Sequence, residues 1–255
     1  MILHIARREW LEQWRQPVML GAIAALFGVI AGVACLGVFF LDRVGADPAL
    51  VRQMATWTSV VGEGGVGPLA EATISVANWL VFTQYLGICA VLAGHSLLHD
   101  REKGTLPFLL LAPVGRVELL AGKVLGALGP PTALYLLVDG LATAFLLTRP
   151  IHVHAAALLP PSPAWFVAFL VGAPAWAAFV STVCAIVSSV VSDVRTAQQI
   201  VWLVMFFATF LCGFALSALL PQGVAVEATV AGFGLAATGL AIWGGSLLMR
   251  RDLGR

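Results

Sequence analysis

The sequence predicts an all-α polytopic membrane protein, a single transmembrane domain over residues 1–255 with six transmembrane helices. Of its residues, 60% are hydrophobic and only 11% are charged, whereas soluble domains carry about 25% charged residues. Six apolar stretches reach the roughly 20 residues needed to cross a bilayer. The Lys and Arg residues also sort to one side of these stretches, as they do in membrane proteins.

Residues 2–16 are expected to form an amphipathic helix that lies in the membrane interface. The segment combines apolar and aromatic residues with charged ones, namely Ile2, Leu3, Ile5, Trp10, Leu11 and Trp14 with Arg7, Arg8, Glu9, Glu12 and Arg15. Helices of this composition place their tryptophans at headgroup level. Pro17 then starts a new chain direction, because proline fixes φ. We expect no cleavable signal peptide, because the apolar run that follows is too long for one.

The six predicted spans share a near absence of charge. They cover about residues 18–41, 77–98, 124–147, 164–191, 200–220 and 228–249. The stretch from Asp42 to about Val76 is polar and is expected to be loop-like. A loop with His152 and His154 precedes the fourth span, and a tight polar turn at 192–195 follows it.

The positions of Lys and Arg predict the orientation of the chain. Six spans place both termini on one side, and that side holds eleven of the fourteen basic residues: Arg7, Arg8, Arg15, Arg101, Lys103, Arg116, Lys123, Arg195, Arg250, Arg251 and Arg255. The other side holds Arg43, Arg52 and Arg149. Since cytoplasmic loops carry the excess of Lys and Arg, we expect both termini in the cytoplasm.

The segment between the second and third spans, residues 99–123, mixes charged and apolar residues. A break at Ala112-Pro113 predicts two short helices joined by a proline corner, which would form a stiff lever because proline restricts the backbone. An ordinary amphipathic interfacial loop is the alternative. We interpret the segment as a cytoplasmic docking element on which another protein acts.

Few side chains inside the predicted spans suggest chemistry. Asp139 is the one acid placed well inside a span. Burying it costs about 2.5–3.5 kcal/mol, so it should face a partner, a polar cavity or the bundle interior. A role in a substrate path and a structural hydrogen bond both stay open. The serines of the fourth span and the glycines of the sixth are expected to be helix-packing contacts.

Metal and nucleotide sites are not expected in this chain. His95 and His99 share a helix face, but no complete ligand set accompanies them, and we favour interfacial histidines. The four cysteines show no CxxC spacing. A phosphate-binding loop is absent, because Gly122-Lys123 is followed by Val124. If ATP is used, another polypeptide must bind it.

The segment from Asp100 to Lys123 resembles the first cytoplasmic loop of type-two ATP-binding-cassette (ABC) exporter permeases. The shared pattern appears here as Asp100-Arg101-Glu102, Gly104-Thr105-Leu106, Leu110-Leu111-Ala112-Pro113 and Gly122-Lys123. The turn that contains Asp193 and Arg195 resembles the second inner turn of these permeases. Pro107 departs from the pattern, because a helix former is more usual there.

The resemblance implies a coupling helix in this loop that docks into a separate ATPase. The implied docking residues are Arg101, Glu102, Lys103, Gly104, Thr105, Leu106, Pro113, Arg116 and Glu118. It also implies a homodimer with two ATPase copies that bind ATP and Mg, in the bacterial cytoplasmic (inner) membrane. The chain itself would bind no cofactor and no nucleic acid, and would couple ATP hydrolysis to export.

Two other functions remain open from the sequence. An ABC-type membrane subunit can drive mechanical, regulatory or metalloprotein-maturation work without a translocated substrate. An integral membrane enzyme is less favoured, because no convergent catalytic set is present. The sequence carries no signature of a particular cargo, and its few intramembrane charges lean toward an apolar or amphipathic one.

Overall fold

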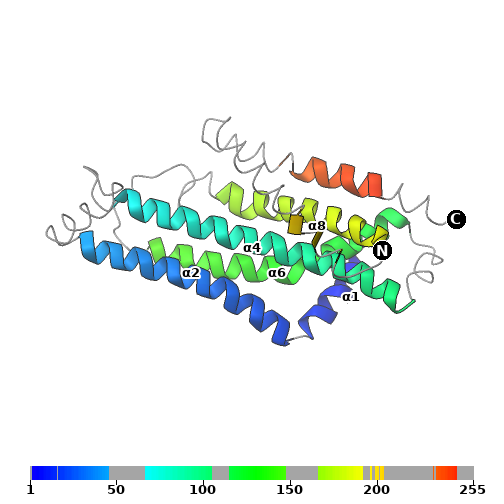
Figure 1. The fold of residues 1–255 in the computed structure, drawn as a ribbon, viewed down its shortest axis with the longest axis horizontal. Helices are drawn as coiled ribbons and strands as arrows, with labels where there is room; N and C mark the ends of the chain where they lie inside the picture. Colours follow the sequence, from blue (N-terminus) through cyan, green and yellow to red (C-terminus); the bar gives the residue numbers. More distant parts are fainter. Residues whose placement is uncertain are drawn as a thin grey trace.

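A computed structural model describes residues 2–15, 17–45, 67–104, 115–147, 166–191, 196, 199–200, 202–203, 232 and 234–245. Its elements are all helical: α1 (Ile2–Trp14), α2 (Pro17–Gly45), α4 (Gly67–Glu102), α6 (Arg116–Leu147), a π-helical turn η1 (Ala168–Gly172) and α8 (Ala173–Val190). The four long helices α2, α4, α6 and α8 lie side by side, while α1 crosses one end of the bundle at an angle (Figure 1).

Four helices are long and apolar enough to cross a membrane. Their apolar segments are Pro17–Phe40, Val76–Ser96, Val117–Phe145 and Ala168–Ser188. The first four predicted spans are thus helical and apolar enough to cross a membrane. The segment 2–16, expected to lie in the membrane interface, is helical from Ile2 to Trp14. The predicted fifth and sixth spans lie largely outside the described residues, although residues 234–245 of the sixth are helical.

The helices extend further than the predicted spans. Helix α2 continues to Gly45 and α4 starts at Gly67, so both ends of the stretch expected to be loop-like are helical. Helix α6 starts at Arg116, about two turns before the predicted span. Residues 116–123 are therefore the first turns of α6 rather than a separate short helix. With 36 residues, α4 is about 54 Å long and exceeds the roughly 30 Å hydrocarbon core.

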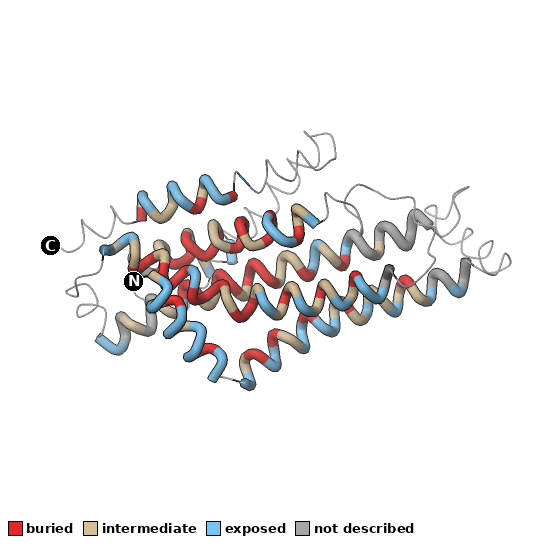
Figure 2. Tube along the Cα trace, turned by 180° about the vertical axis from the view of Figure 1, so that it is seen from behind, coloured by how far each residue is buried: buried red, intermediate tan, exposed pale blue. Residues whose placement is uncertain are grey.

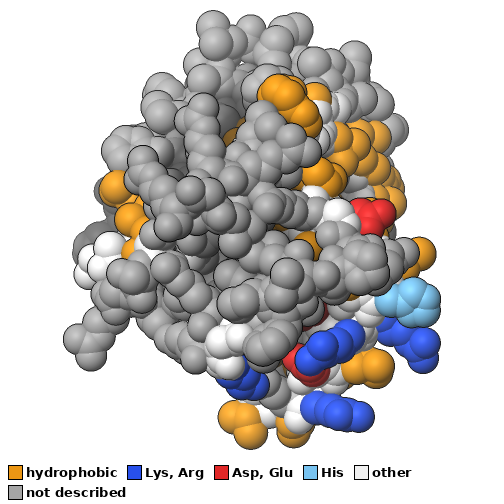
Figure 3. Space-filling model, turned by 90° about the vertical axis from the view of Figure 1, so that its right-hand side faces the viewer, with side chains coloured by type: hydrophobic (Ala, Val, Ile, Leu, Met, Phe, Trp, Pro, Cys, Tyr) orange, Lys and Arg blue, Asp and Glu red, His pale blue; other side chains and the backbone are white. Residues whose placement is uncertain are grey.

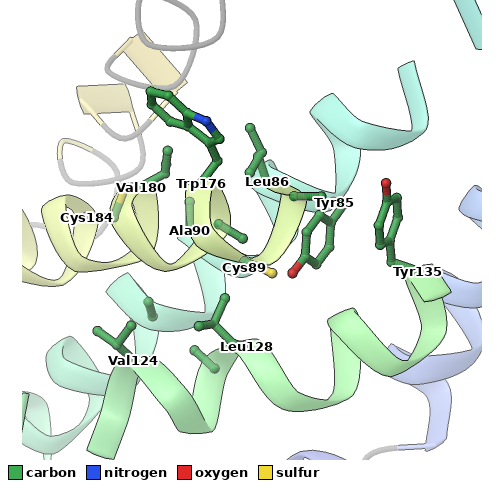
Figure 4. Packing of buried hydrophobic residues seen from close by; sticks show 14 of the residues in the cluster. Tyr85, Leu86, Cys89, Ala90, Val124, Leu128, Tyr135, Trp176, Val180 and Cys184 are labelled. Carbon is green, nitrogen blue, oxygen red and sulfur yellow. The ribbon is translucent and has the colours of Figure 1, made fainter. Parts of the chain in front are cut away.

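Aromatic rings from four helices meet in the middle of the bundle. Tyr85 of α4 stacks on Tyr135 of α6 with ring centroids 4.5 Å apart, as Figure 4 shows. Phe27 and Phe169 pack against the same Tyr135 ring. The Tyr85 hydroxyl lies 2.7 Å from Thr132 Oγ1, and Thr132 donates to the Leu128 carbonyl. Tyr85 is therefore the donor, and its buried polar tip is satisfied.

Small residues let α4 and α8 approach closely, as expected for helices packed in a membrane. A Cβ at Gly94 of α4 would lie 2.9 Å from Ser188 Oγ of α8. The packing role predicted for Ser188 is thus confirmed. In the predicted sixth span, Gly234 and Gly245 contact α8 through Ala175 and Ile186. Buried residues accordingly concentrate along the middle of the bundle, whereas α1 and α2 keep exposed faces (Figure 2).

Candidate functional site

The N-terminal helix α1 lies in a socket on α6 that is built from three glycines. Gly122, Gly126 and Gly129 follow one another along one face of α6. A Cβ at Gly126 would lie 2.5 Å from Glu9 Cβ, and one at Gly129 would overlap the Trp10 indole. Any larger residue in the stripe would therefore push the two helices apart.

Pro130 in α6 leaves a backbone carbonyl in this socket without its usual donor within the helix. Pro130 lies inside the helix and has no backbone N–H, so it cannot donate to the Gly126 carbonyl four residues earlier. Gln13 Nε2 of α1 donates to that carbonyl at 3.3 Å. Trp10 Nε1 donates to the adjacent Leu125 carbonyl at 2.8 Å. The Gly129-Pro130-Pro131 sequence thus fixes α1 through both shape and hydrogen bonding.

A buried ionic cluster ties α1 to the neighbouring ends of α4 and α6. The Lys123 ammonium of α6 is 2.9 Å from Glu9 Oε1 and 2.5 Å from Asp100 Oδ2, and its side chain is only 3% exposed. It also donates to Ser96 Oγ at 2.9 Å. Ser96 in turn donates to Glu9 Oε2 at 3.2 Å. We call Glu9, Ser96, Asp100 and Lys123 the three-helix cluster.

The three-helix cluster satisfies a charge that would be costly to bury alone. An unpaired ammonium out of water is strongly unfavourable, whereas pairing with carboxylates and hydrogen bonds offsets the desolvation. The two acids come from different helices, and the side chains of Glu9 and Asp100 are themselves only 18% and 20% exposed. Lys123 therefore holds α1 and α4 to α6 at one point.

The cluster lies where the chain leaves α4 and returns to α6. Helix α4 ends at Glu102, and Gly104 follows with φ of +68°, a left-handed conformation that glycine adopts without strain and that is typical after a helix end. Helix α6 begins at Arg116, with Glu118 in its first turn. Pairing of Asp100 with Lys123 therefore brings the two ends of the predicted docking element together.

The described residues contain only part of the predicted docking set. Arg101 and Glu102 lie in the last turn of α4, Lys103 and Gly104 follow it and are exposed, and Arg116 and Glu118 start α6. Thr105, Leu106 and Pro113 lie outside the described residues, as do Asp193 and Arg195 of the second inner turn. Docking itself therefore stays a prediction.

Sequence reasoning missed the three-helix cluster. It counted Glu9 among the charged residues of an expected interfacial helix and Lys123 among the basic residues on the expected cytoplasmic side. A signal was present in the register of α6, because Lys123 follows the buried Leu119 and Leu120 by four and three residues and precedes Ala127 by four. A lysine on such an apolar face needs an acidic partner.

Asp139 lies in the bundle interior, at only 5% exposure. Thr132, Tyr135 and Thr143 share its face of α6 by helical spacing, and Tyr135 and Thr143 are also buried. This polar stripe matches the expected interior placement, while the role of Asp139 stays open.

The remaining features of interest are an apolar hollow and the histidines considered as metal ligands. An apolar hollow of about 490 Å³ lies between α2 and α4, and is lined by Val29, Ile30, Val33, Ala34, Thr73, Val76, Ala77 and Leu80. His95 is exposed on α4. Within the described ranges no three His, Cys, Asp or Glu side chains gather to hold a metal ion, and His152 and His154 lie outside those ranges.

The glycine socket predicts a sharp difference between two alanine substitutions in α6. Gly126→Ala should destabilise the protein by about 1–3 kcal/mol, because the new methyl group overlaps Glu9. Gly140→Ala is the control, because nothing lies within 4 Å of a Cβ there. Thermal unfolding in detergent and hydrogen exchange of residues 2–14 measure the effect. Equal unfolding midpoints and equal exchange in the two variants would contradict the socket.

The three-helix cluster predicts that Lys123→Met destabilises the junction of α1, α4 and α6. The substitution leaves two partly buried carboxylates without a cation, at a cost on the order of 3 kcal/mol. Lys103→Met provides the control, since Lys103 is exposed beyond the end of α4. Adding Glu9→Gln to Lys123→Met should restore part of the loss. A Lys123→Met protein with the unfolding midpoint of the control would refute the stabilising role.

Comparison with known protein families agrees with this architecture. The family model described as ABC-2 type transporter matches residues 2–222, which include α1, the four long helices and the three-helix cluster. No curated protein matches the chain. The match covers well over half of the sequence. The matched region contains four helices that are long and apolar enough to cross a membrane. The chain therefore belongs to the ABC-2 type transporter family, as a membrane permease subunit.

Proposed function

We propose that this permease subunit couples ATP hydrolysis by a separate ATPase to export across the bacterial cytoplasmic membrane. Two copies of the chain would form the transport path, each docking one ATPase subunit through the segment between α4 and α6. The observation that supports this proposal most directly is the three-helix cluster. It lies at the base of that segment and joins α4, α6 and α1 through one buried lysine.

The geometry suggests how a force on the segment between α4 and α6 would be transmitted to the other helices. Residues 105–114 connect the end of α4 to the start of α6, so a force on them acts on both helices at once. Lys123 links both helices to α1, and α4 packs extensively against α8. Packed elements of this kind move as bodies rather than deforming continuously. ATP-driven closure of the ATPase pair would therefore tilt the helices together.

We infer that α2 provides the surface that faces lipid and the second copy of the chain. Only 22% of its apolar span is buried, and Val29, Val33, Leu36 and Phe40 are exposed. A second copy of the chain would cover part of this face. The apolar hollow between α2 and α4 has a lining suited to the hydrocarbon part of a cargo. We therefore propose an apolar or amphipathic cargo.

Charge reversal in the docking element tests the proposed coupling. Arg101→Glu, Glu102→Lys or Arg116→Glu should weaken binding of the ATPase by about 2 kcal/mol, or roughly thirtyfold in Kd, because each replaces an attraction at the interface by repulsion. Arg43→Glu is the control, since Arg43 lies at the opposite end of α2 over the Phe39 ring. Binding and ATPase activity of the reconstituted complex are measured. Unchanged binding in all three variants would sink the docking assignment.

Site-directed labelling tests the orientation. A cysteine at Lys103 (Lys103→Cys) should react with a membrane-impermeant maleimide only after the membrane is opened, because the basic end of the bundle is expected in the cytoplasm. Arg43 lies near the C-terminal end of α2, and the sorting of basic residues places this end outside the cytoplasm. Arg43→Cys should therefore react in intact cells. The opposite pattern would reverse the topology and remove the docking element from the reach of an ATPase.

A further inference from the structure

Helix α1 presents three distinct faces. Its face toward α6 contains Ile2, Ile5, Ala6, Glu9 and Gln13, and Trp10 lies at the edge of this face with its indole in the socket. A second face is exposed and polar, with His4, Arg8, Glu12 and Arg15. The third face is exposed and apolar, with Leu3 at 76%, Leu11 at 50% and Trp14 at 51% exposure. Docking on α6 therefore leaves a row of large apolar side chains uncovered.

One charged residue lies in the middle of this apolar face. Arg7 follows Leu3 by four residues and precedes Leu11 by four and Trp14 by seven, so all four share one side of the helix. Arg7 is exposed, and it makes no ion pair within the described part of the chain. Its neighbour Arg8 differs, because Arg8 Nε pairs with Glu12 Oε1 at 3.2 Å. The uncompensated cation is thus on the apolar side.

The surroundings indicate what covers this face. Helix α2 begins at Pro17, directly after α1, and is apolar enough to cross the membrane. Its first turn exposes Val18 at 86%, four residues after the exposed Trp14 of α1, so exposed apolar side chains lie on both sides of the junction between the two helices. Figure 3 looks onto the end of the molecule where α1 lies and shows basic side chains beside hydrophobic ones along its lower edge. Such a mixture is typical of a surface at the headgroup boundary.

We propose that the apolar face of α1 is a binding surface for anionic phospholipid, with Arg7 contacting the headgroup phosphate. Leu3, Leu11 and Trp14 would enter the acyl boundary while the guanidinium reaches outward to the phosphate, as long basic side chains do at interfaces. Arginine donates two parallel hydrogen bonds to a phosphate group. The proposal requires only that the chain is embedded in a bilayer, and it does not depend on ATP-driven export.

The test uses the full-length protein in phosphatidylcholine nanodiscs that contain a minor fraction of phosphatidylglycerol. A fluorophore on a cysteine at Leu11 (Leu11→Cys) reports local lipid through quenching by brominated lipid. Brominated phosphatidylglycerol should quench more strongly than brominated phosphatidylcholine at equal mole fraction. Arg7→Gln should reduce this preference about fivefold, the contribution typical of one basic side chain at an anionic surface. Arg7→Lys should retain most of it.

Arg8→Gln is the matched control, because it removes the same charge one residue away on the polar face. It should leave the phosphatidylglycerol preference unchanged. Equal quenching by the two lipids before mutation would overturn the proposal, and so would equal losses in Arg7→Gln and Arg8→Gln. Absence of quenching by either lipid would show that protein covers the face instead. Size-exclusion profiles identify any variant that fails to fold. If Arg7→Gln fails to fold, Arg7→Lys still tests the proposal, because loss of the phosphatidylglycerol preference in that variant would overturn it.

Discussion

The junction of α1, α4 and α6 in this permease depends on one buried lysine. Lys123 carries a charge at a position that α6 otherwise fills with apolar residues, and it is stable there because Glu9 and Asp100 approach from two other helices. The same contacts that neutralise the lysine also fix the distance between α4 and α6 at their ends. The cluster therefore links electrostatic stability to the geometry of the segment that connects these two helices.

The attachment of α1 has a different physical basis. Amphipathic helices at a membrane surface bind lipid through their apolar face, whereas the contacts that hold α1 here are made with α6. Three glycines remove the side chains that would separate it from α6, and Pro130 leaves a carbonyl that Gln13 occupies. Because one face of α1 is used in this way, its apolar face and its polar face are free for other contacts. One face of this helix thus contacts protein, while an apolar face and a polar face stay exposed.

Much of the fold could be predicted from composition and charge. Long apolar runs must form helices in a bilayer, where every backbone group needs an internal partner, and four of the six predicted spans are present as helices. Helix ends were less predictable: α6 starts at Arg116 because a polar, charged segment can continue a helix beyond the hydrocarbon core. The predicted packing role of small residues holds for Ser188, Gly234 and Gly245. Their small size lets the neighbouring helices approach closely.

The amino-acid sequence was enough to predict the membrane class, apolar helices at the first four spans, the helical character of residues 2–14 and the family to which the chain belongs. Each of these follows from local composition or from a contiguous motif. The folded chain was needed to show that Glu9, Ser96, Asp100 and Lys123 meet, and that a glycine stripe receives α1. The contacts between α1 and α6 join residues more than a hundred positions apart, and local patterning carries no information about which distant side chain will neutralise a buried charge.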